Sequence, residues 1–92
     1  MPNIKYVGKN LFVEKLSISN IANKKGTPFY VYSENQIKEN YLKFLNTFKK
    51  INPLICFAAK SNSNTYILRS LGKLGSGADV VSVGELLKAL KA

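Results

Sequence analysis

The sequence has no histidine, one cysteine and few acidic residues, and each shortage excludes a class of protein. Without histidine, the chain cannot build a serine–histidine–aspartate triad or a histidine-based metal site. Because Cys56 is the only cysteine, an internal disulfide is excluded, which fits a reducing compartment. No apolar run approaches the ~18 residues that span a bilayer, and the first residues lack the pattern of a secretory signal. We therefore expect a cytoplasmic chain with no metal site and no membrane segment.

Negative charge is scarce, because 5 acidic residues stand against 14 basic ones, which gives a net charge of +9. Such a balance can indicate a nucleic-acid partner. However, 13 of the basic residues are scattered lysines, and Arg69 is the only arginine, the residue type best suited to phosphates and base edges. We interpret the lysines as solvated surface and expect no nucleic-acid partner. A small basic nucleic-acid-binding module is the alternative from a different class, and it predicts an affinity that falls steeply with salt.

Residues 1–26 form a segment of their own. Tyr6–Val7 and Leu11–Val13 are short apolar runs on either side of a glycine-containing turn, which predicts a β-hairpin. A short helix is expected next, with Ser17 or Ser19 as its N-cap and a glycine after its end.

Residues 27–92 alternate between apolar runs and amphipathic stretches. The runs predict strands at Phe29–Tyr32, Leu54–Ala59 and Ala78–Val81, and a helical apolar stripe follows each. A β-α-β-α-β-α order implies an α/β fold with a parallel sheet and right-handed crossovers. The pattern alone leaves both a barrel and an open doubly wound sheet possible. The middle run is apolar throughout and predicts a strand buried on both faces, with Cys56 as a small core residue.

Local signals mark where each of these helices begins and ends. Ser33–Gln36 and Ser82–Glu85 have the spacing of capping boxes, and Ser63 or Asn64 can cap the middle helix. The glycines of residues 75–77 are expected to end that middle helix.

The length of 92 residues is too small for a complete barrel, which needs on the order of 200–250 residues. Three parallel strands would expose two sheet edges, and the last helix is still apolar at Ala89–Leu90. We therefore expect the chain to be a fragment, or to pair with something else.

Lys60 is the first candidate for chemistry. It directly follows the apolar run, and strand alternation would place it on the same face as Cys56 and Ala58. In parallel α/β folds, ligands bind at the carboxyl ends of the strands. A lysine desolvated there has a lowered pKa and a nucleophilic amine. The alternative interpretation is a lysine that emerges into solvent where the strand ends.

Two carboxylates are further candidates. Asp79 lies within an apolar run, where it must be paired or hydrogen-bonded, and adjacent strands could bring it to Lys60. Alternatively, Asp79 accepts from backbone amides of the preceding glycine turn. Glu85 completes the capping box with Ser82, and a role in a site requires that its side chain turn toward the strand ends.

Three motifs resemble one family, the fold-type III decarboxylases that use pyridoxal 5′-phosphate. Phe57–Asn64 is similar to the cofactor-binding strand of that family, usually Y-A-V-K-A-N. Gly75–Leu86 is similar to the next strand, and Gly26–Tyr32 to the first barrel strand, G-T-P-x-Y-V-Y. The branch that acts on diaminopimelate is most similar, with G-A-D-V-V-S-G-G-E-L. Val83 replaces one glycine of that motif, so an ornithine or arginine decarboxylase, or an alanine racemase, is the alternative within the fold.

The resemblance implies a fold and a reaction. Residues 27–92 would form the first three βα units of a pyridoxal-phosphate-binding (β/α)8 barrel of the alanine racemase type, and residues 1–26 would belong to a β-domain. Lys60 would hold the cofactor covalently, with Asp79 and Glu85 beside it. The reaction would be decarboxylation of meso-2,6-diaminopimelate, a small amino-acid substrate, to L-lysine. Residues that bind the phosphate and the ring would come from later strands, the full-length protein would be a homodimer, and this chain alone would be inactive.

Overall fold

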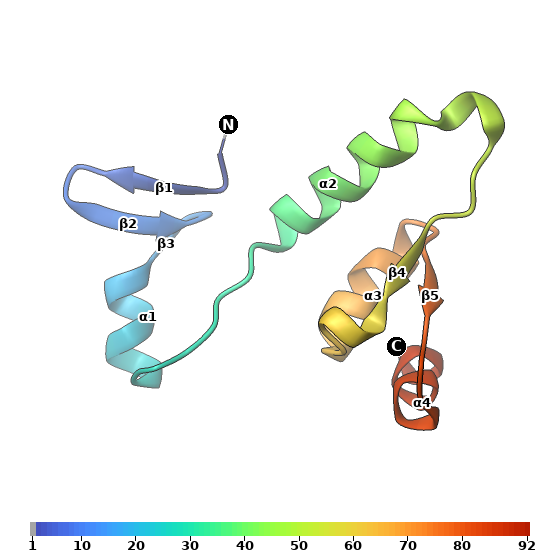
Figure 1. Cartoon of the computed structure of the whole chain (residues 1–92). Coiled ribbons are helices and arrows are strands. Elements are labelled where there is room, and N and C mark those ends of the chain that lie inside the picture. The colour runs from blue at the N-terminus through green and yellow to red at the C-terminus, as the bar shows by residue number, and fades with distance from the viewer. Residues whose placement is uncertain (1) are drawn as a thin grey trace. The chain divides into compact units, whose positions relative to one another are not determined.

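The computed structural model describes residues 2–92 (Figure 1). Contacts between residues divide the chain into two compact units. One ends at Ile37, and the other runs from Lys38 to Ala92. We expected a boundary after residue 26, between a segment of a β-domain and the start of a barrel. These two units do not test that boundary, which stays a prediction. No helix within residues 2–92 has both the length and the apolar character needed to cross a membrane.

The first unit begins with a small antiparallel sheet. β1 (Ile4–Val7) pairs with β2 (Asn10–Val13), which confirms the predicted hairpin, and β2 pairs with β3 (Leu16–Ser17). Gly8 has φ 64° in the first turn, a conformation that glycine adopts without strain. The third strand was not predicted, because its turn places Glu14 at φ 54°, where a glutamate carries no sequence signal.

Helix α1 (Ile18–Lys25) is the predicted short helix. The Ser17 hydroxyl accepts a hydrogen bond of 3.5 Å from the backbone N–H of Asn20, so Ser17 and not Ser19 is the N-cap. Gly26 follows at φ 76° and donates its N–H to the last turn. The glycine was expected at this place because left-handed backbone conformations commonly end helices.

The start of helix α2 (Glu34–Thr47) confirms Ser33 as its cap, which is the serine half of the first predicted capping box. The Ser33 hydroxyl accepts from the N–H of Gln36 and donates to Glu14 Oε2, both at 3.1 Å. Ser33 is only 4% exposed, so these two bonds satisfy a polar group that burial would otherwise penalise. The helix start is thereby tied to the turn between β2 and β3.

The strand predicted at Phe29–Tyr32 is wrong, because this segment has no regular structure. Tyr30 is 90% exposed, and Val31 and Tyr32 are exposed as well. A strand exists only through hydrogen bonds to a neighbour. Within residues 2–92 the ladders join β1, β2 and β3, or the two strands of the second unit, and none reaches this segment. The residue types of this segment favour a strand, but a strand forms only where a second strand is available to pair with it.

The second unit contains one of the expected β-α-β repeats (Figure 1). β4 (Cys56–Ala58) pairs in parallel with β5 (Gly77–Asp79), and α3 (Thr65–Lys73) connects them. α4 (Val83–Lys91) follows β5 and contacts α3. The α/β alternation is confirmed for this part of the chain, in a mixed α/β structure.

Both strands of the second unit are shorter than predicted, and β4 is not buried on both faces. Leu54 is 76% exposed and Cys56 is exposed, so the prediction of Cys56 as a core residue is wrong. Ala59, directly after the strand, is fully buried. Within residues 2–92 β4 has one strand neighbour, so its other edge is unpaired. Val81, predicted at the end of the third strand, lies outside β5 and is 68% exposed.

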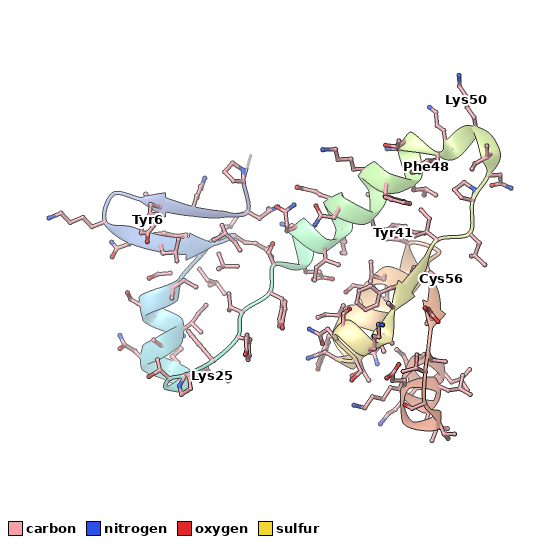
Figure 2. The ribbon with its side chains drawn as sticks, viewed as in Figure 1. Tyr6, Lys25, Tyr41, Phe48, Lys50 and Cys56 are labelled. Carbon is pink, nitrogen blue, oxygen red and sulfur yellow. The ribbon has the colours of Figure 1, made fainter. Side chains whose placement is uncertain are left out.

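The core of the second unit is built mainly from α3 and the end of β4. Leu68 and Leu71 of α3 are buried, as are Ala59 and Tyr41. Tyr41 comes from α2 (Figure 2). After α2, a short 3-10 helix (Lys49–Ile51) ends in the left-handed conformation of Asn52, before the chain enters β4.

The end of α3 is a complete Schellman motif, in which two N–H groups beyond the helix satisfy its last carbonyls. The N–H of Gly75 donates to the Gly72 carbonyl at 3.0 Å, and the N–H of Ser76 donates to the Leu71 carbonyl at 3.1 Å. Gly75 has φ 100°, which requires glycine. The predicted helix end is therefore confirmed, and it sets where β5 begins.

Close packing between β4 and β5 yields a test of this strand pair. A Cβ atom added at Gly77 would lie 2.7 Å from the Cys56 sulfur but 3.7 Å from the Cys56 Cβ. We expect Gly77→Ala to lower the free energy of unfolding by about 1 kcal/mol, because the cysteine side chain must move. In a Cys56→Ala background the same change should cost clearly less. Urea unfolding of the four proteins of this double-mutant cycle measures the coupling, and strictly additive effects would contradict the contact.

Candidate functional site

Lys60 lies just beyond β4, in a 3-10 turn (η2, Ala59–Ser61) and not in the strand. Strand alternation therefore stops at Ala58, and the prediction that Lys60 shares a face with Cys56 and Ala58 is wrong. The Ser61 hydroxyl closes the turn by donating to the Ala58 carbonyl at 2.8 Å. Lys60 is exposed, and within residues 2–92 its amine has no hydrogen bond or ion pair.

Asp79 is the last residue of β5, and the parallel register places it opposite Ala58. Lys60 follows Ala58 by two residues, so the lysine and the aspartate lie at the same carboxyl edge of the strand pair. In the described part of the chain no ion pair joins them. Asp79 is exposed to solvent, so the predicted need for a partner inside an apolar strand does not arise.

Ser82 caps α4 as predicted, and Glu85 completes a variant of the capping box in which its carboxylate reaches the N–H of Val81 instead of that of Ser82. The Ser82 hydroxyl accepts from the N–H of Glu85, and Glu85 Oε1 accepts from the N–H of Val81, both at 3.1 Å. β5 ends at Asp79 and the N-cap of α4 is Ser82, so Glu85 lies in the first turn of the helix that follows this strand. One of its carboxylate oxygens is thus engaged in the structure of the helix start.

The loop between Lys60 and α3 is organised by its asparagines. Asn64 is the N-cap of α3, because its Oδ1 accepts from the N–H of Tyr66 at 2.9 Å. Asn62 Oδ1 accepts in turn from the N–H of Asn64 at 3.0 Å. Of the two predicted caps, Asn64 is therefore confirmed and Ser63 is wrong.

The Ser63 hydroxyl instead makes a contact that the sequence pattern does not predict. Lys88 of α4 donates from Nζ to Ser63 Oγ at 3.2 Å, across 25 residues of sequence. No local pattern indicates this pair. The helix dipole favours a lysine near a helix C-terminus in any case, so the position of Lys88 does not reveal a distant partner.

Chemically, this edge presents one primary amine and two carboxylates around the beginnings of two helices. An exposed lysine amine can attack a carbonyl carbon, and carboxylates can accept hydrogen bonds from a bound molecule. A cavity of about 190 Å³ lies elsewhere, between the sheet and the two helices, and its lining contains none of the three candidates. Among residues 2–92, no cluster of histidine, cysteine or acidic side chains has the size of a metal site.

Comparisons with known proteins agree with one another. Residues 34–92 match a family described as "Pyridoxal-dependent decarboxylase, pyridoxal binding domain". The chain is 45% identical over 91 residues to a diaminopimelate decarboxylase of Aquifex aeolicus, covering 99% of this chain. It is 53% identical over 66 residues to the protein of that name in Helicobacter pylori, covering 72% of this chain.

Solved structures give the same result. A crystal structure of diaminopimelate decarboxylase from M. jannaschii in complex with L-lysine superposes with a TM-score of 0.91 at 39% identity, over 97% of this chain. The chain spans about a fifth of the length of these relatives, 21% of the Aquifex protein, 16% of the Helicobacter pylori protein and 22% of the M. jannaschii structure.

The cap at Ser82 gives a test of how the strand end is fixed. We expect Ser82→Ala to lower the free energy of unfolding by about 1 kcal/mol, because the N–H of Glu85 loses its acceptor. Ser82→Asn keeps a side-chain acceptor and should retain most of the stability. Urea unfolding followed by circular dichroism measures both, and equal losses in the two variants would contradict a capping role.

Proposed function

This chain belongs to the pyridoxal-dependent decarboxylase family, and on that premise we propose that it provides the lysine-bearing edge of the cofactor site in a diaminopimelate decarboxylase. The observation that carries the proposal is the exposed Lys60 amine at the carboxyl edge of two parallel strands. Relatives named diaminopimelate decarboxylase are similar over nearly the whole chain, which supports this branch over the others.

The residues at this edge fit pyridoxal 5′-phosphate. The cofactor carries an aldehyde, and an exposed primary amine without an internal partner is the group that reacts with it. The turn after β4 holds the Lys60 backbone in place while its side chain remains in solvent. Lys60 is therefore the residue that would hold the cofactor.

Each residue then has a separate task. Lys60 would hold the cofactor through its amine, from the turn that follows β4. Asp79, opposite Ala58, offers a carboxylate that can accept hydrogen bonds from the N–H and O–H groups of the cofactor or substrate. Glu85 offers its remaining oxygen at the start of α4. When bound, pyridoxal phosphate accepts the electrons that remain as carbon dioxide leaves an amino acid.

The proposal includes the wider setting of this site. Residues 27–92 would be the first three βα units of a (β/α)8 barrel, in which Phe29–Tyr32 would become a strand only by pairing with strands outside this chain, and residues 1–26 a segment of a β-domain. The reaction would be decarboxylation of meso-2,6-diaminopimelate to L-lysine in the cytoplasm, by a homodimer. Support comes from the motif resemblance and from the relative that was crystallised with L-lysine.

Covalent trapping tests the lysine. The protein purified from its source cells is incubated with pyridoxal phosphate, reduced with borohydride and digested, and the modified peptide is identified by mass spectrometry. We expect the modification on Lys60 and its disappearance in Lys60→Ala, because this lysine alone lies in the turn at the carboxyl end of β4. Lys73→Ala, which removes an exposed lysine at the end of α3, is the matched control and should keep the label. A label at another lysine, or none, would refute the role of Lys60.

Release of carbon dioxide tests the substrate. With the same preparation, meso-2,6-diaminopimelate should give carbon dioxide and L-lysine, whereas ornithine and arginine should give none above background. Release from ornithine or arginine instead would assign the protein to another branch of the family, and racemisation of alanine would assign it to a different reaction on the same fold.

The 92-residue chain produced by itself should be inactive. Its second unit pairs only two strands among the residues described, and α4 exposes Leu86, Leu87 and Leu90. The resemblance also places the phosphate- and ring-binding residues outside this chain. Carbon dioxide release from diaminopimelate by the isolated chain, measured at micromolar protein with excess cofactor, would contradict this expectation.

A further inference from the structure

The turn that carries Lys60 is in contact with the following βα unit. Helix α4 contacts η2, and Lys88 of α4 donates from Nζ to Ser63 Oγ at 3.2 Å. Ser63 lies three residues after Lys60 and is half-buried, whereas Lys88 is exposed. One side chain of α4 thus reaches the segment between the candidate lysine and α3.

The other polar side-chain contacts of this segment are local. The Ser61 hydroxyl bonds to the carbonyl three residues before it, and Asn62 accepts from the N–H two residues after it. Such bonds fix the shape of the loop, but they do not fix its place relative to α4. The Lys88 bond does, because its two ends belong to different elements.

Lys88 also lies three residues after Glu85, so the two side chains start from the same face of α4. A link from Lys88 to the Lys60 loop therefore fixes the spacing between two of the three candidate groups. Backbone pairing already fixes the third, Asp79, through its register with Ala58.

We propose that Lys88 is a positioning residue, which holds the loop of residues 60–63 against α4 by donating a hydrogen bond to Ser63. It touches neither cofactor nor substrate, and it acts through the placement of Lys60. The contact between Lys88 and Ser63 lies within this chain and does not depend on the proposed function. Its effect on cofactor binding by Lys60 does rest on that function.

Hydrogen exchange tests the contact without the cofactor. In the purified protein freed of pyridoxal phosphate, we expect Lys88→Met and Ser63→Ala each to speed exchange of the Asn64 amide, which Asn62 holds, about fivefold. The double variant should be no faster than either single one, because both remove the same bond. Lys88→Arg should restore slow exchange, and Lys91→Met, at an exposed lysine of the same helix, should leave it unchanged.

Trapping then tests the effect on Lys60. The rate at which borohydride-stable label appears on Lys60 after cofactor is added should fall about fivefold in Lys88→Met and recover in Lys88→Arg. Wild-type exchange rates in Lys88→Met, or additive effects in the double variant, would overturn the inference. If exchange depends on Lys88 while the wild type never labels Lys60, the positioning contact stands and the proposed function falls.

Discussion

The parallel pairing of β4 with β5 is the constraint on which the second unit depends. Two parallel strands need a crossover connection, so α3 must run back alongside them. The pairing also brings both carboxyl ends to one edge, where the chain turns into η2 after β4 and into α4 after β5. Lys60, Asp79 and Glu85, well separated in sequence, come to one edge for this reason, and among the residues described no hydrogen bond or ion pair joins them.

Features set by neighbouring residues were predictable from the sequence. The hairpin, the caps at Ser33 and Ser82, and the glycine end of α3 all follow from bonds between residues a few positions apart. The location of Lys60 and Asp79 at one sheet edge was also predictable, because the alternation of strands and helices implies parallel strands. Local chemistry and topology together therefore locate the candidate site at the level of an edge.

Features set by distant residues were not predictable. The apolar run at Phe29–Tyr32 has strand composition, yet pairing is decided by segments far away, and none within residues 2–92 pairs with it. Cys56 is exposed because burial depends on what covers β4 and not on its own sequence. The turn at Lys60 was not predictable, because strand alternation carries no information about where the chain leaves the strand. The bond between Lys88 and Ser63 was not predictable either, because its two residues lie 25 positions apart in the sequence.

The capping box at the start of α4 has a consequence for how sequence motifs in this family carry information. Ser82 and Glu85 belong to the motif of the resemblance, and both make the hydrogen bonds that begin a helix. Natural selection for a stable fold would therefore preserve these two letters even in a descendant that had lost its reaction. Lys60 has no such second duty among the residues described, so across homologous genes it is the position whose retention or loss reports on chemistry.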